Sequence, residues 1–579
     1  MAQHYSSGPV RLRMGGASAL SGSLARRTPP DAEAILASVL SALDAGELET
    51  ASGRAAAALA AGFEHPVLLC VRAMGLQASG AVEAALPHLH RAVALQPQDA
   101  SIRNALARCL AELGRYAEAL VVVEAALPLQ PGNAETHANK GLALERLGEL
   151  AAAERSYRRA LELHPGQVLA RVGMANLCLH FGAAGEARAH AEAAVGAAPD
   201  YAPAGLALAN AALAQGQAAD AEARIRRLMA QPGADPWLAS HLGDALDVQD
   251  RTEEAFQAWT RSGEALRRLH AGAFAADDVL AWAEGAAEAL ERLPAARWPG
   301  SAAGRPPPAP VRQHVLLTGF ARSGTSLLGL ALEGLEQVEV LQEREPMTDA
   351  LRRFGGRDGL ARLLSASEAE LDLYRDAYWR RVRSAGARLD RAVFVDKQPM
   401  NALHLPLVTR LFPAARILFM RRDPRDVALG CFRRRFLMNR YTYQLLTAEG
   451  SARLYGAAMR IAERTRELAS PDMLAVRQEM LVADFRGAMG EVCRVLGLPW
   501  SEAIGGFAGR IRSSSVATPS APQLARGLNA DGVGRWRRYA PQLRPLSPIL
   551  EPWVRRFGYP PTPAESPDLS FGVRSAGRG

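Results

Sequence analysis

The residues best suited to chemistry stand in a short loop, GFARSGTS at residues 319–326, between two apolar segments. The segment before it, HVLLT at 314–318, predicts a buried strand, and LLGLALEGL after it predicts a helix. Small residues in such a loop let successive backbone N–H groups converge on an anion, and the helix adds the positive end of its dipole. Hydroxyl groups and the guanidinium of Arg322 supply further donors. The loop therefore predicts a phosphate-binding site.

The spacing of Gly319 and Gly324 matches the loop that binds nucleotide triphosphates, but the position that requires Lys in that motif holds Thr325. No side chain is then placed to reach a β- or γ-phosphate, so an NTPase or a nucleotide kinase is disfavoured. Loops rich in Gly, Ser and Thr are also common as simple tight turns. The loop by itself does not decide the function.

Two further charged motifs follow strand-like runs. DKQPMN at 396–401 follows AVFVD at 392–396, and RRDPRD at 421–426 follows ARILFM at 415–420, with a fourth run, MLAVR, at 473–477. Alternation of such runs with helical stretches predicts a parallel sheet with helices on both faces, in which ligands bind beyond the carboxyl ends of the strands. The RRDPRD motif fits either a helix cap or a second phosphate site.

Lys397 stands out because the chain uses arginine almost everywhere else. Among 68 basic residues only Lys140 and Lys397 are lysines. A compact ammonium rather than a planar guanidinium is therefore expected to be needed at the edge of the sheet, the alternative being an ordinary surface lysine.

The N-terminal half repeats itself with a period of 34 residues, marked by one glycine and one proline in each repeat. The glycines are Gly46, Gly80, Gly114, Gly148, Gly182 and Gly216, and the prolines in strict register are Pro97, Pro131, Pro165 and Pro199. Glycine suits the turn inside a helix pair, and proline suits the stop before the next pair. The pattern resembles the tetratricopeptide repeat family in six or so units over roughly 200 residues. That resemblance implies a helical solenoid that binds a peptide or protein partner, the alternative being a structural stalk or dimerisation arm.

Composition argues against several other classes of protein. With 49% hydrophobic and 22% charged residues the chain is of the ordinary globular kind, and no stretch is apolar for the roughly 18 residues that a membrane helix needs. The five cysteines are scattered, which argues against disulfides and a zinc site, and no metal is expected. The net charge of +8 is spread along the chain, so a small polyanion is favoured over nucleic acid. Without a recognisable secretion signal, a cytoplasmic location is expected.

These features predict five segments: a disordered leader at 1–34, the repeat solenoid at 35–293, a proline-rich linker at 294–313, an α/β domain at 314–560 and a disordered tail at 561–579. The predicted fold class is an all-α solenoid followed by an α/β domain that resembles P-loop proteins and has a parallel sheet.

The three motifs GFARSGTS, DKQPMN and RRDPRDVALGCF, in that order, resemble the sulfotransferases that use 3′-phosphoadenosine-5′-phosphosulfate (PAPS). VRQEMLVADFRGAMGEVCRVLGLPW and TPSAPQLARGLNADGVGRWRRY extend the resemblance over about residues 314–558. Some bacterial members of this family also carry tetratricopeptide repeats. The resemblance implies transfer of a sulfuryl group from PAPS to a hydroxyl of a peptide, glycan or small metabolite, without a metal.

The resemblance also implies residue roles. Residues of the loop would grip the 5′-phosphosulfate, namely Arg322, Ser323, Gly324, Thr325 and Ser326. Arg422 would hold the 3′-phosphate, Ser520 and Arg535 would close over the donor, and Lys397 would steady the bridging oxygen of the leaving group. The base would be Glu343 in the segment VEVLQEREPMTD, with Glu345 as the alternative if the local alignment shifts.

Three departures from the family pattern keep a second hypothesis open. Gly430 stands where a serine usually contacts the 3′-phosphate, Ala321 replaces the usual loop proline, and Met480 replaces an acidic residue. The alternative is a catalytically inactive, repeat-based adaptor that retains nucleotide binding.

Overall fold

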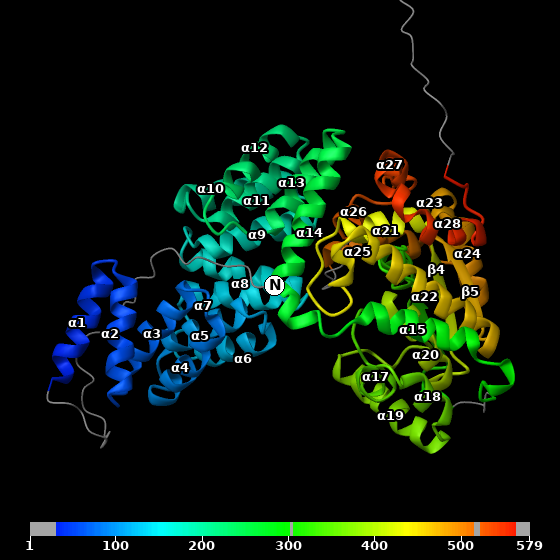
Figure 1. Cartoon of the computed structure of the whole chain (residues 1–579), viewed down its shortest axis with the longest axis horizontal. Coiled ribbons are helices and arrows are strands. Elements are labelled where there is room, and N and C mark those ends of the chain that lie inside the picture. Colours follow the sequence, from blue (N-terminus) through cyan, green and yellow to red (C-terminus); the bar gives the residue numbers. More distant parts are fainter. Residues whose placement is uncertain (1–30, 301–304, 514–520, 563–579) are drawn as a thin grey trace, which may run out of the picture. The chain divides into compact units, whose positions relative to one another are not determined.

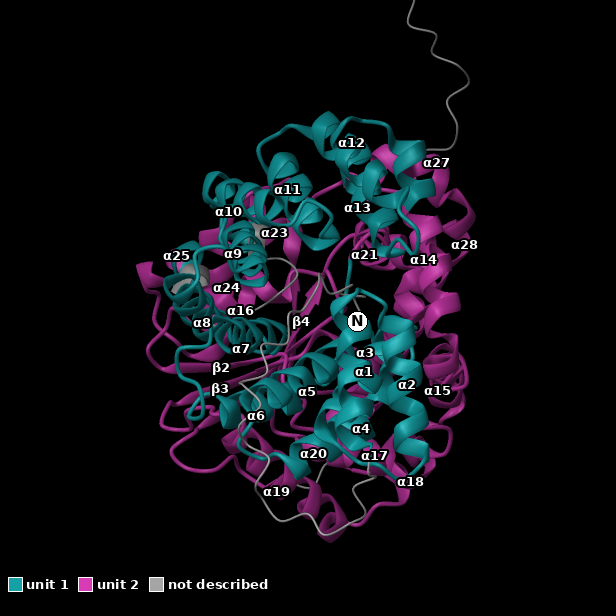
Figure 2. Ribbon diagram, turned by 90° about the vertical axis from the view of Figure 1, so that its left-hand side faces the viewer, with its two compact units in different colours: residues 1–258, 435–438, 507–527 teal, residues 259–434, 439–506, 528–579 magenta. Residues whose placement is uncertain are grey.

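The computed structural model describes residues 31–300, 305–513 and 521–562. The leader predicted for residues 1–34 and the tail predicted for 561–579 fall almost wholly outside the described residues, as does Ser520. The chain divides into two compact units (Figure 2). Unit 1 comprises residues 1–258, 435–438 and 507–527, and unit 2 comprises Trp259–Arg434, Asn439–Gly506 and Leu528–Gly579.

Unit 1 is a succession of helix pairs, as expected for the repeats, and each helix packs on the next (Figure 1). Its helices are α1 (Ala32–Asp44), α2 (Leu48–Ala60), α3 (Pro66–Ala78), α4 (Val82–Leu95), α5 (Ala100–Glu112), α6 (Tyr116–Ala126), α7 (Ala134–Arg146), α8 (Leu150–Leu163), α9 (Val168–His180), α10 (Ala184–Ala197), α11 (Ala202–Ala214), α12 (Ala218–Met229), α13 (Trp237–Val248), α25 (Phe507–Ser513) and α26 (Ala521–Leu524). The boundary between the units falls inside α14 (Thr252–Phe274).

The periodic glycines and prolines have the positions that the sequence predicted. All six glycines lie in the turn inside a helix pair with φ between 75° and 84°, where a side chain would be strained. The four in-register prolines lie between one pair and the next, where they end a helix without breaking its interior. The 34-residue period therefore specifies the solenoid through its turns.

Close packing inside the solenoid depends on small residues around one large ring. Tyr157 of α8 is fully buried and donates a hydrogen bond to Glu145 Oε2 at 2.7 Å. A Cβ atom added to Gly141 of α7 or Gly173 of α9 would lie 2.5 Å or 2.2 Å from the Tyr157 ring. The ring thus fills the space that two glycines leave open on neighbouring helices.

We expect Gly173→Ala to destabilise unit 1 by about 1–3 kcal/mol, because the new methyl group overpacks a ring that is held at both its face and its hydroxyl. The matched control is Gly185→Ala in α10, where a Cβ atom meets nothing within 4 Å and the better helix propensity stabilises by up to about 1 kcal/mol. Thermal unfolding followed by circular dichroism measures both. Equal melting temperatures for the two variants would contradict this account of the packing.

Unit 2 carries a five-stranded parallel sheet in the order β2-β3-β1-β4-β5, surrounded by helices. Its strands are β1 (Gln313–Thr318), β2 (Val338–Gln342), β3 (Val393–Lys397), β4 (Arg416–Arg421) and β5 (Met473–Arg477). Its helices are the later part of α14, α15 (Val279–Arg292), α16 (Thr325–Leu332), α17 (Thr348–Phe354), α18 (Gly359–Ser365), α19 (Glu368–Ser384), α20 (Leu405–Leu411), α21 (Pro424–Phe432), α22 (Ala448–Ala469), α23 (Gln478–Ala483), α24 (Phe485–Leu496), α27 (Ala540–Leu543) and α28 (Ser547–Arg556), with the 3₁₀ turns η1 (Ala295–Arg297), η2 (Pro399–His404), η3 (Gln444–Leu446), η4 (Glu502–Gly506), η5 (Arg535–Tyr539) and η6 (Arg544–Leu546).

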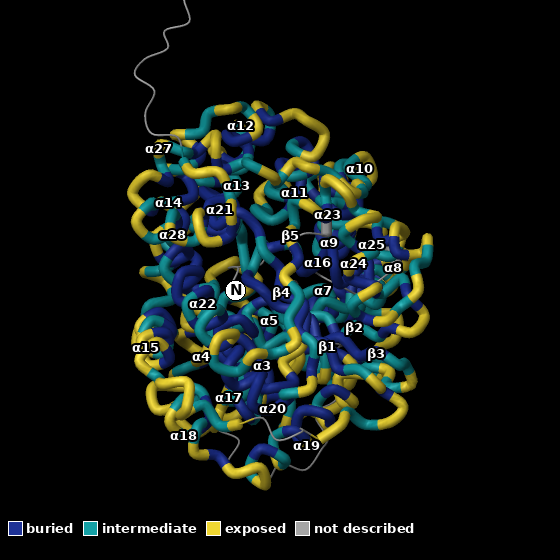
Figure 3. The backbone as a smooth tube through the Cα atoms, turned by 90° about the vertical axis from the view of Figure 1, so that its right-hand side faces the viewer, coloured by how far each residue is buried: buried dark blue, intermediate teal, exposed yellow. Residues whose placement is uncertain are grey.

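Burial explains why three of the four predicted strands were visible in the sequence, while the fourth, β5, is an edge strand that was found from its apolar run MLAVR. β1, β3 and β4 lie inside the sheet and are buried along nearly their whole length, as the dark blue strands in Figure 3 show. Parallel strands covered on both faces appear in the sequence as continuous apolar runs. β2 is an edge strand with the half-buried Glu339 in its middle, and it was not predicted. Among the described residues, no helix combines the length and apolar character required to cross a membrane.

Candidate functional site

The phosphate loop is folded by its own backbone and by Ser323. It begins after β1 and ends where α16 starts, with φ of 67° at Arg322 and 102° at Gly324. The Ser323 hydroxyl donates to Phe320 O at 2.7 Å and accepts from Phe320 N at 3.2 Å. A Cβ atom at Gly324 would lie 2.7 Å from Gln478 Cγ, so a side chain does not fit there. The turn therefore presents the free amides of the first turn of α16 to an anion.

Two arginines meet at this loop. Arg422, directly after β4, is buried and donates from Nη1 to Arg322 O at 2.9 Å; its Nη2 donates to Gly532 O. Burial, with the nearby Arg422 charge adding to it, lowers the pKa of Arg322 to about 10, so Arg322 remains cationic at neutral pH. Two like charges held together at the start of a helix form a site that an anion would stabilise.

The RRDPRD motif caps a helix and also positions a loop. Asp423 accepts from Arg425 N at 3.0 Å at the start of α21 and forms an ion pair with the Arg425 guanidinium at 2.7 Å. Asp426 accepts from Gly534 N at 2.7 Å and from Trp536 N at 2.8 Å. These bonds fix the turn of η5 that carries Arg535, so the motif ties the C-terminal segment of unit 2 to the end of β4.

Lys397 and Glu343 form an ion pair at the end of the sheet. Lys397 is the last residue of β3, its side chain is 0% exposed, and Nζ donates to Glu343 Oε1 at 2.6 Å. Glu343 follows β2 with φ of 45°, and its backbone N donates to Lys397 O at 2.9 Å. The Glu343 side chain is 36% exposed, so the buried ammonium has a partner that solvent reaches.

The register of the sheet brings this pair near the loop. Lys397 lies opposite Leu317 of β1, two residues before Gly319, and a Cβ atom at Gly329 of α16 would lie 3.6 Å from Lys397 Cγ. Glu345, the alternative base, is exposed, and its carbonyl accepts from Thr348 N at 3.2 Å and from Thr348 Oγ1 at 2.6 Å. The ammonium is therefore buried beside the helix that begins at the phosphate loop.

A cluster of three buried polar side chains, Asp396, Tyr378 and His314, lies on the face of β3 opposite to Lys397. Tyr378 OH donates to Asp396 Oδ2 at 3.0 Å and lies 2.9 Å from His314 Nε2. Burial raises the pKa of Asp396 to about 7, with Tyr378 and Lys397 opposing it, and burial lowers the pKa of His314 to about 3. Between about pH 3 and pH 7 both side chains are thus uncharged in the folded protein.

These two groups give opposite pH dependences of stability. From pH 4 to about 7 the folded state holds a proton on Asp396 that the unfolded state has released, so this group's contribution falls as pH rises. From pH 3 to about 6.5 the unfolded state holds an extra proton on His314, so that contribution rises with pH.

We expect that Asp396→Asn removes the contribution of Asp396 to the pH dependence of stability and leaves that of His314. Between pH 4 and 6.5 the free energy of unfolding of this variant, relative to the native protein, should rise by up to about 1.4 kcal/mol per pH unit. Denaturant unfolding across this range measures the difference, with the exposed Asp358→Asn as the control. Parallel curves for Asp396→Asn and the native protein would show that the two groups do not titrate as described.

The structure brings most of the predicted site residues to one edge of the sheet. Nine of these residues lie at or just after the carboxyl ends of β1, β2, β3 and β4: Arg322, Ser323, Gly324, Thr325, Ser326, Glu343, Glu345, Lys397 and Arg422. Arg535 begins η5, while Ser520 lies outside the described residues. Sequence reasoning missed Asp426 and the buried group on the far side of β3. Within residues 31–300, 305–513 and 521–562 no three His, Cys, Asp or Glu side chains are grouped as metal ligands.

Comparison with known families separates the two halves of the chain. Residues 314–502 match the sulfotransferase family, and residues 76–140 and 139–202 match tetratricopeptide repeats. The matches confirm that the chain contains a sulfotransferase-family domain and tetratricopeptide repeats, and the predicted fold class is confirmed.

Individual relatives are distant. An uncharacterized protein of Aquifex aeolicus (strain VF5) is 23% identical over 261 residues, 43% of this chain and 34% of that protein, so the chain spans about a third of that relative. The sulfotransferase domain of the Synechococcus PCC 7002 olefin synthase is 22% identical, with 42% of this chain and 90% of that domain covered and a TM-score of 0.30. A thermophilic tetratricopeptide-repeat protein of Thermus thermophilus is 26% identical, with 31% and 98% covered and a TM-score of 0.28.

Proposed function

Since this chain joins tetratricopeptide repeats to a domain of the sulfotransferase family, we propose that it transfers a sulfuryl group from PAPS to a hydroxyl acceptor. The acceptor class is a peptide, glycan or small metabolite. The observation that supports this most strongly is the buried Lys397 ammonium, paired with Glu343 beside the helix that begins at the phosphate loop.

The residues of the loop fit a donor that carries several phosphate charges. The first amides of α16 and the hydroxyls of Thr325 and Ser326 would hold the 5′-phosphosulfate together with Arg322. Arg422 would hold the 3′-phosphate, and Arg535 would approach from η5, which Asp426 holds in place. Ser520 retains its proposed closing role without a described position.

Lys397 is proposed to act where negative charge develops. PAPS supplies an activated sulfuryl group whose departure leaves charge on the phosphate oxygen. An ammonium that is already buried is preorganised to stabilise this charge, since it requires little solvent reorganisation. The backbone that carries Lys397 is also held rigidly, because β3 pairs with β1 on one side and with β2 on the other.

Glu343 is proposed to take the proton of the attacking hydroxyl at a carboxylate oxygen. Its side chain is the partly exposed member of the ion pair, so an acceptor can reach it. The left-handed backbone at Glu343 turns the chain directly after β2 and directs the carboxylate back toward β3. Glu345 remains the alternative base.

The test separates an enzyme from the inactive adaptor. The full chain is incubated with PAPS labelled in its sulfate and a panel of hydroxyl acceptors, while calorimetry measures binding of adenosine 3′,5′-bisphosphate. Transfer of label supports the proposed enzyme. Binding of the bisphosphate without transfer to any acceptor favours the adaptor, and absence of both overturns the assignment of the loop.

Gly430 tests whether the departure from the family pattern weakens donor binding. A Cβ atom there would lie 3.4 Å from Arg322 Cβ, an ordinary contact, so a serine fits on α21 beside the loop. We expect Gly430→Ser to tighten bisphosphate binding by about threefold to tenfold, the effect of one added hydrogen bond. Gly430→Ala is the control for helix propensity. An equal gain in both variants would show that the hydroxyl makes no contact with the ligand.

The repeats are proposed to recruit the acceptor or its carrier protein. The proposed boundaries stay as predicted, with the solenoid at 35–293, the linker at 294–313 and the transferase domain at 314–560. A solenoid of this kind supplies a long surface without catalytic groups, which suits a recruiting role.

A further inference from the structure

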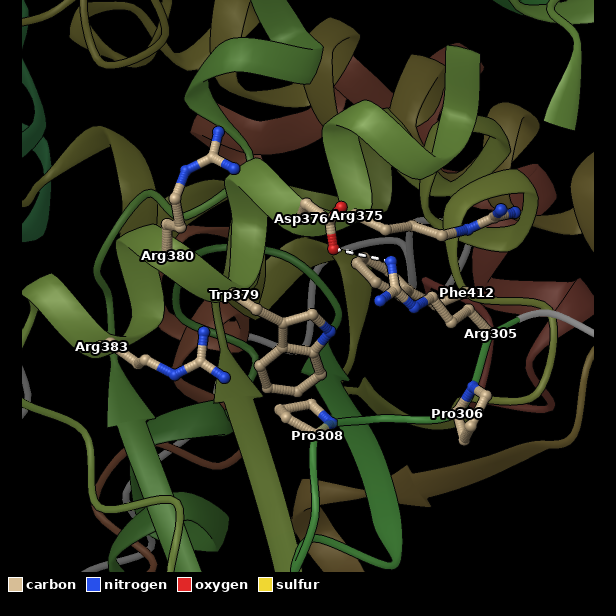
Figure 4. A pocket seen from close by; sticks show the side chains of 9 residues that line it. All are labelled: Arg305, Pro306, Pro308, Arg375, Asp376, Trp379, Arg380, Arg383 and Phe412. Atoms are coloured by element: carbon tan, nitrogen blue, oxygen red, sulfur yellow. Dashed lines mark hydrogen bonds and ion pairs between the residues drawn. The ribbon is translucent and has the colours of Figure 1, made fainter. Parts of the chain in front are cut away.

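Unit 2 holds a polar cavity, lined by the segment before β1, by α19 and by Phe412, the residue after α20 (Figure 4). Its volume is about 230 Å³. Pro308 precedes β1, Phe412 precedes β4, and the end of α19 precedes β3, so the cavity lies at the amino ends of these strands. The phosphate loop follows the carboxyl end of β1. The cavity is therefore separate from the proposed donor site.

The cavity has a flat apolar wall. Trp379 and Phe412 are each 8% exposed, and the ring of Pro308 lies against the indole in Figure 4. Trp379 is held from behind by His314, whose ring centroid lies 5.0 Å from its own, and by Phe394 at 5.3 Å. The indole is therefore fixed in place, and the small part of it that is exposed offers a ring a limited edge contact.

Most of the charges around the cavity are already paired. Arg375 is buried and donates to Leu411 O at 2.6 Å, and it forms ion pairs with Glu368 at 3.0 Å and Asp372 at 2.8 Å. Arg305 pairs with Asp376 at 2.9 Å across the cavity, as the dashed line in Figure 4 shows. These arginines form the wall and leave no excess charge.

Arg380 and Arg383 carry the excess charge. Both are exposed and line the cavity on the same side of Trp379. Within the described residues neither side chain has a hydrogen bond or an ion pair closer than 4 Å. Their spacing of three places both on one face of α19, where two like charges are unfavourable; Asp349 acts electrostatically on Arg380 from outside the helix.

We propose that this cavity binds a small aromatic anion: a sulfate, phosphate or carboxylate group between Arg380 and Arg383, attached to one ring that lies against Trp379 and Pro308. Two guanidinium groups favour a tetrahedral or planar oxyanion through paired charge-assisted hydrogen bonds. The volume suits a single ring with one such group.

The test titrates the full chain with phenyl sulfate, phenyl phosphate and benzoate, with the proposed donor site saturated by adenosine 3′,5′-bisphosphate. Phenol and inorganic sulfate are the comparison ligands, and calorimetry gives the affinities. The three aromatic anions distinguish the possible acidic groups. We expect at least one of them to bind about tenfold more tightly than phenol or inorganic sulfate, because only it engages both the arginines and the indole.

Variants locate the binding. The double substitution Arg380→Gln and Arg383→Gln should lower the affinity for the best aromatic anion by about tenfold or more. Arg357 is an exposed arginine outside the cavity, so Arg357→Gln should leave this affinity unchanged. Trp379→Phe should lower the affinity for the aromatic anion but not the affinity for inorganic sulfate. Failure of every aromatic anion to bind, equal binding of phenol, or equal loss in the Arg357 variant would each overturn the proposal.

Discussion

Lys397→Ala is expected to lower kcat by about 10²–10³-fold, the effect of removing one preorganised group that stabilises charge in a transition state. Binding of adenosine 3′,5′-bisphosphate should change far less, because the ammonium is proposed to act on charge that appears only during transfer. Steady-state rates with labelled PAPS, together with calorimetric titration of the bisphosphate, measure the two effects separately.

The chain supplies a natural control for this variant. Lys140, the only other lysine, lies in α7 of the solenoid and pairs with Glu124 at 3.0 Å, so Lys140→Ala should leave kcat unchanged. Arg322→Ala should lower both turnover and bisphosphate affinity, since it removes a cation that is proposed to hold the ligand in every state. A Lys397→Ala variant with native kcat would remove the lysine from the mechanism.

How far the sequence predicts this fold depends on how local the signal is. The turn glycines need only a left-handed backbone, and the interior strands need only continuous burial, so both are visible one segment at a time. The edge strand β2 has one partner and a half-buried Glu339, and its pattern resembles that of a loop. β5 is also an edge strand, but its run MLAVR is apolar enough to be predicted.

The candidate site shows the same limit. The loop and Lys397 were found because residue type and spacing alone suggest phosphate chemistry. The Asp426 carboxylate accepts hydrogen bonds from the backbone amides of Gly534 and Trp536, which lie more than 100 residues later in the chain. No local sequence pattern predicts such a contact. The ion pair between Lys397 and Glu343 likewise depends on β2 lying beside β3, a pairing that exists only in the folded sheet.

That pairing bears on the choice between the two candidate bases. Glu343 is tied to Lys397 by a side-chain contact of 2.6 Å and a backbone bond of 2.9 Å, whereas Glu345, two residues later, accepts through its carbonyl from Thr348 instead. A proton acceptor must be held near the reacting atoms, and the position of Glu343 is fixed by the strand that carries the lysine.

Glu343→Gln is therefore expected to lower kcat by about 10²–10⁴-fold, the range for loss of a general base, and to leave bisphosphate affinity within about threefold. The amide oxygen of Gln can still accept from Lys397 Nζ, so the lysine keeps a hydrogen-bond partner and the fold is preserved. Glu345→Gln, changed in the same way two residues later, should keep native turnover. The same labelled-PAPS assay measures both variants, and a large loss in Glu345→Gln with native turnover in Glu343→Gln would transfer the role of base to Glu345. Loss in neither variant would mean that the acceptor hydroxyl gives up its proton without a glutamate from this segment.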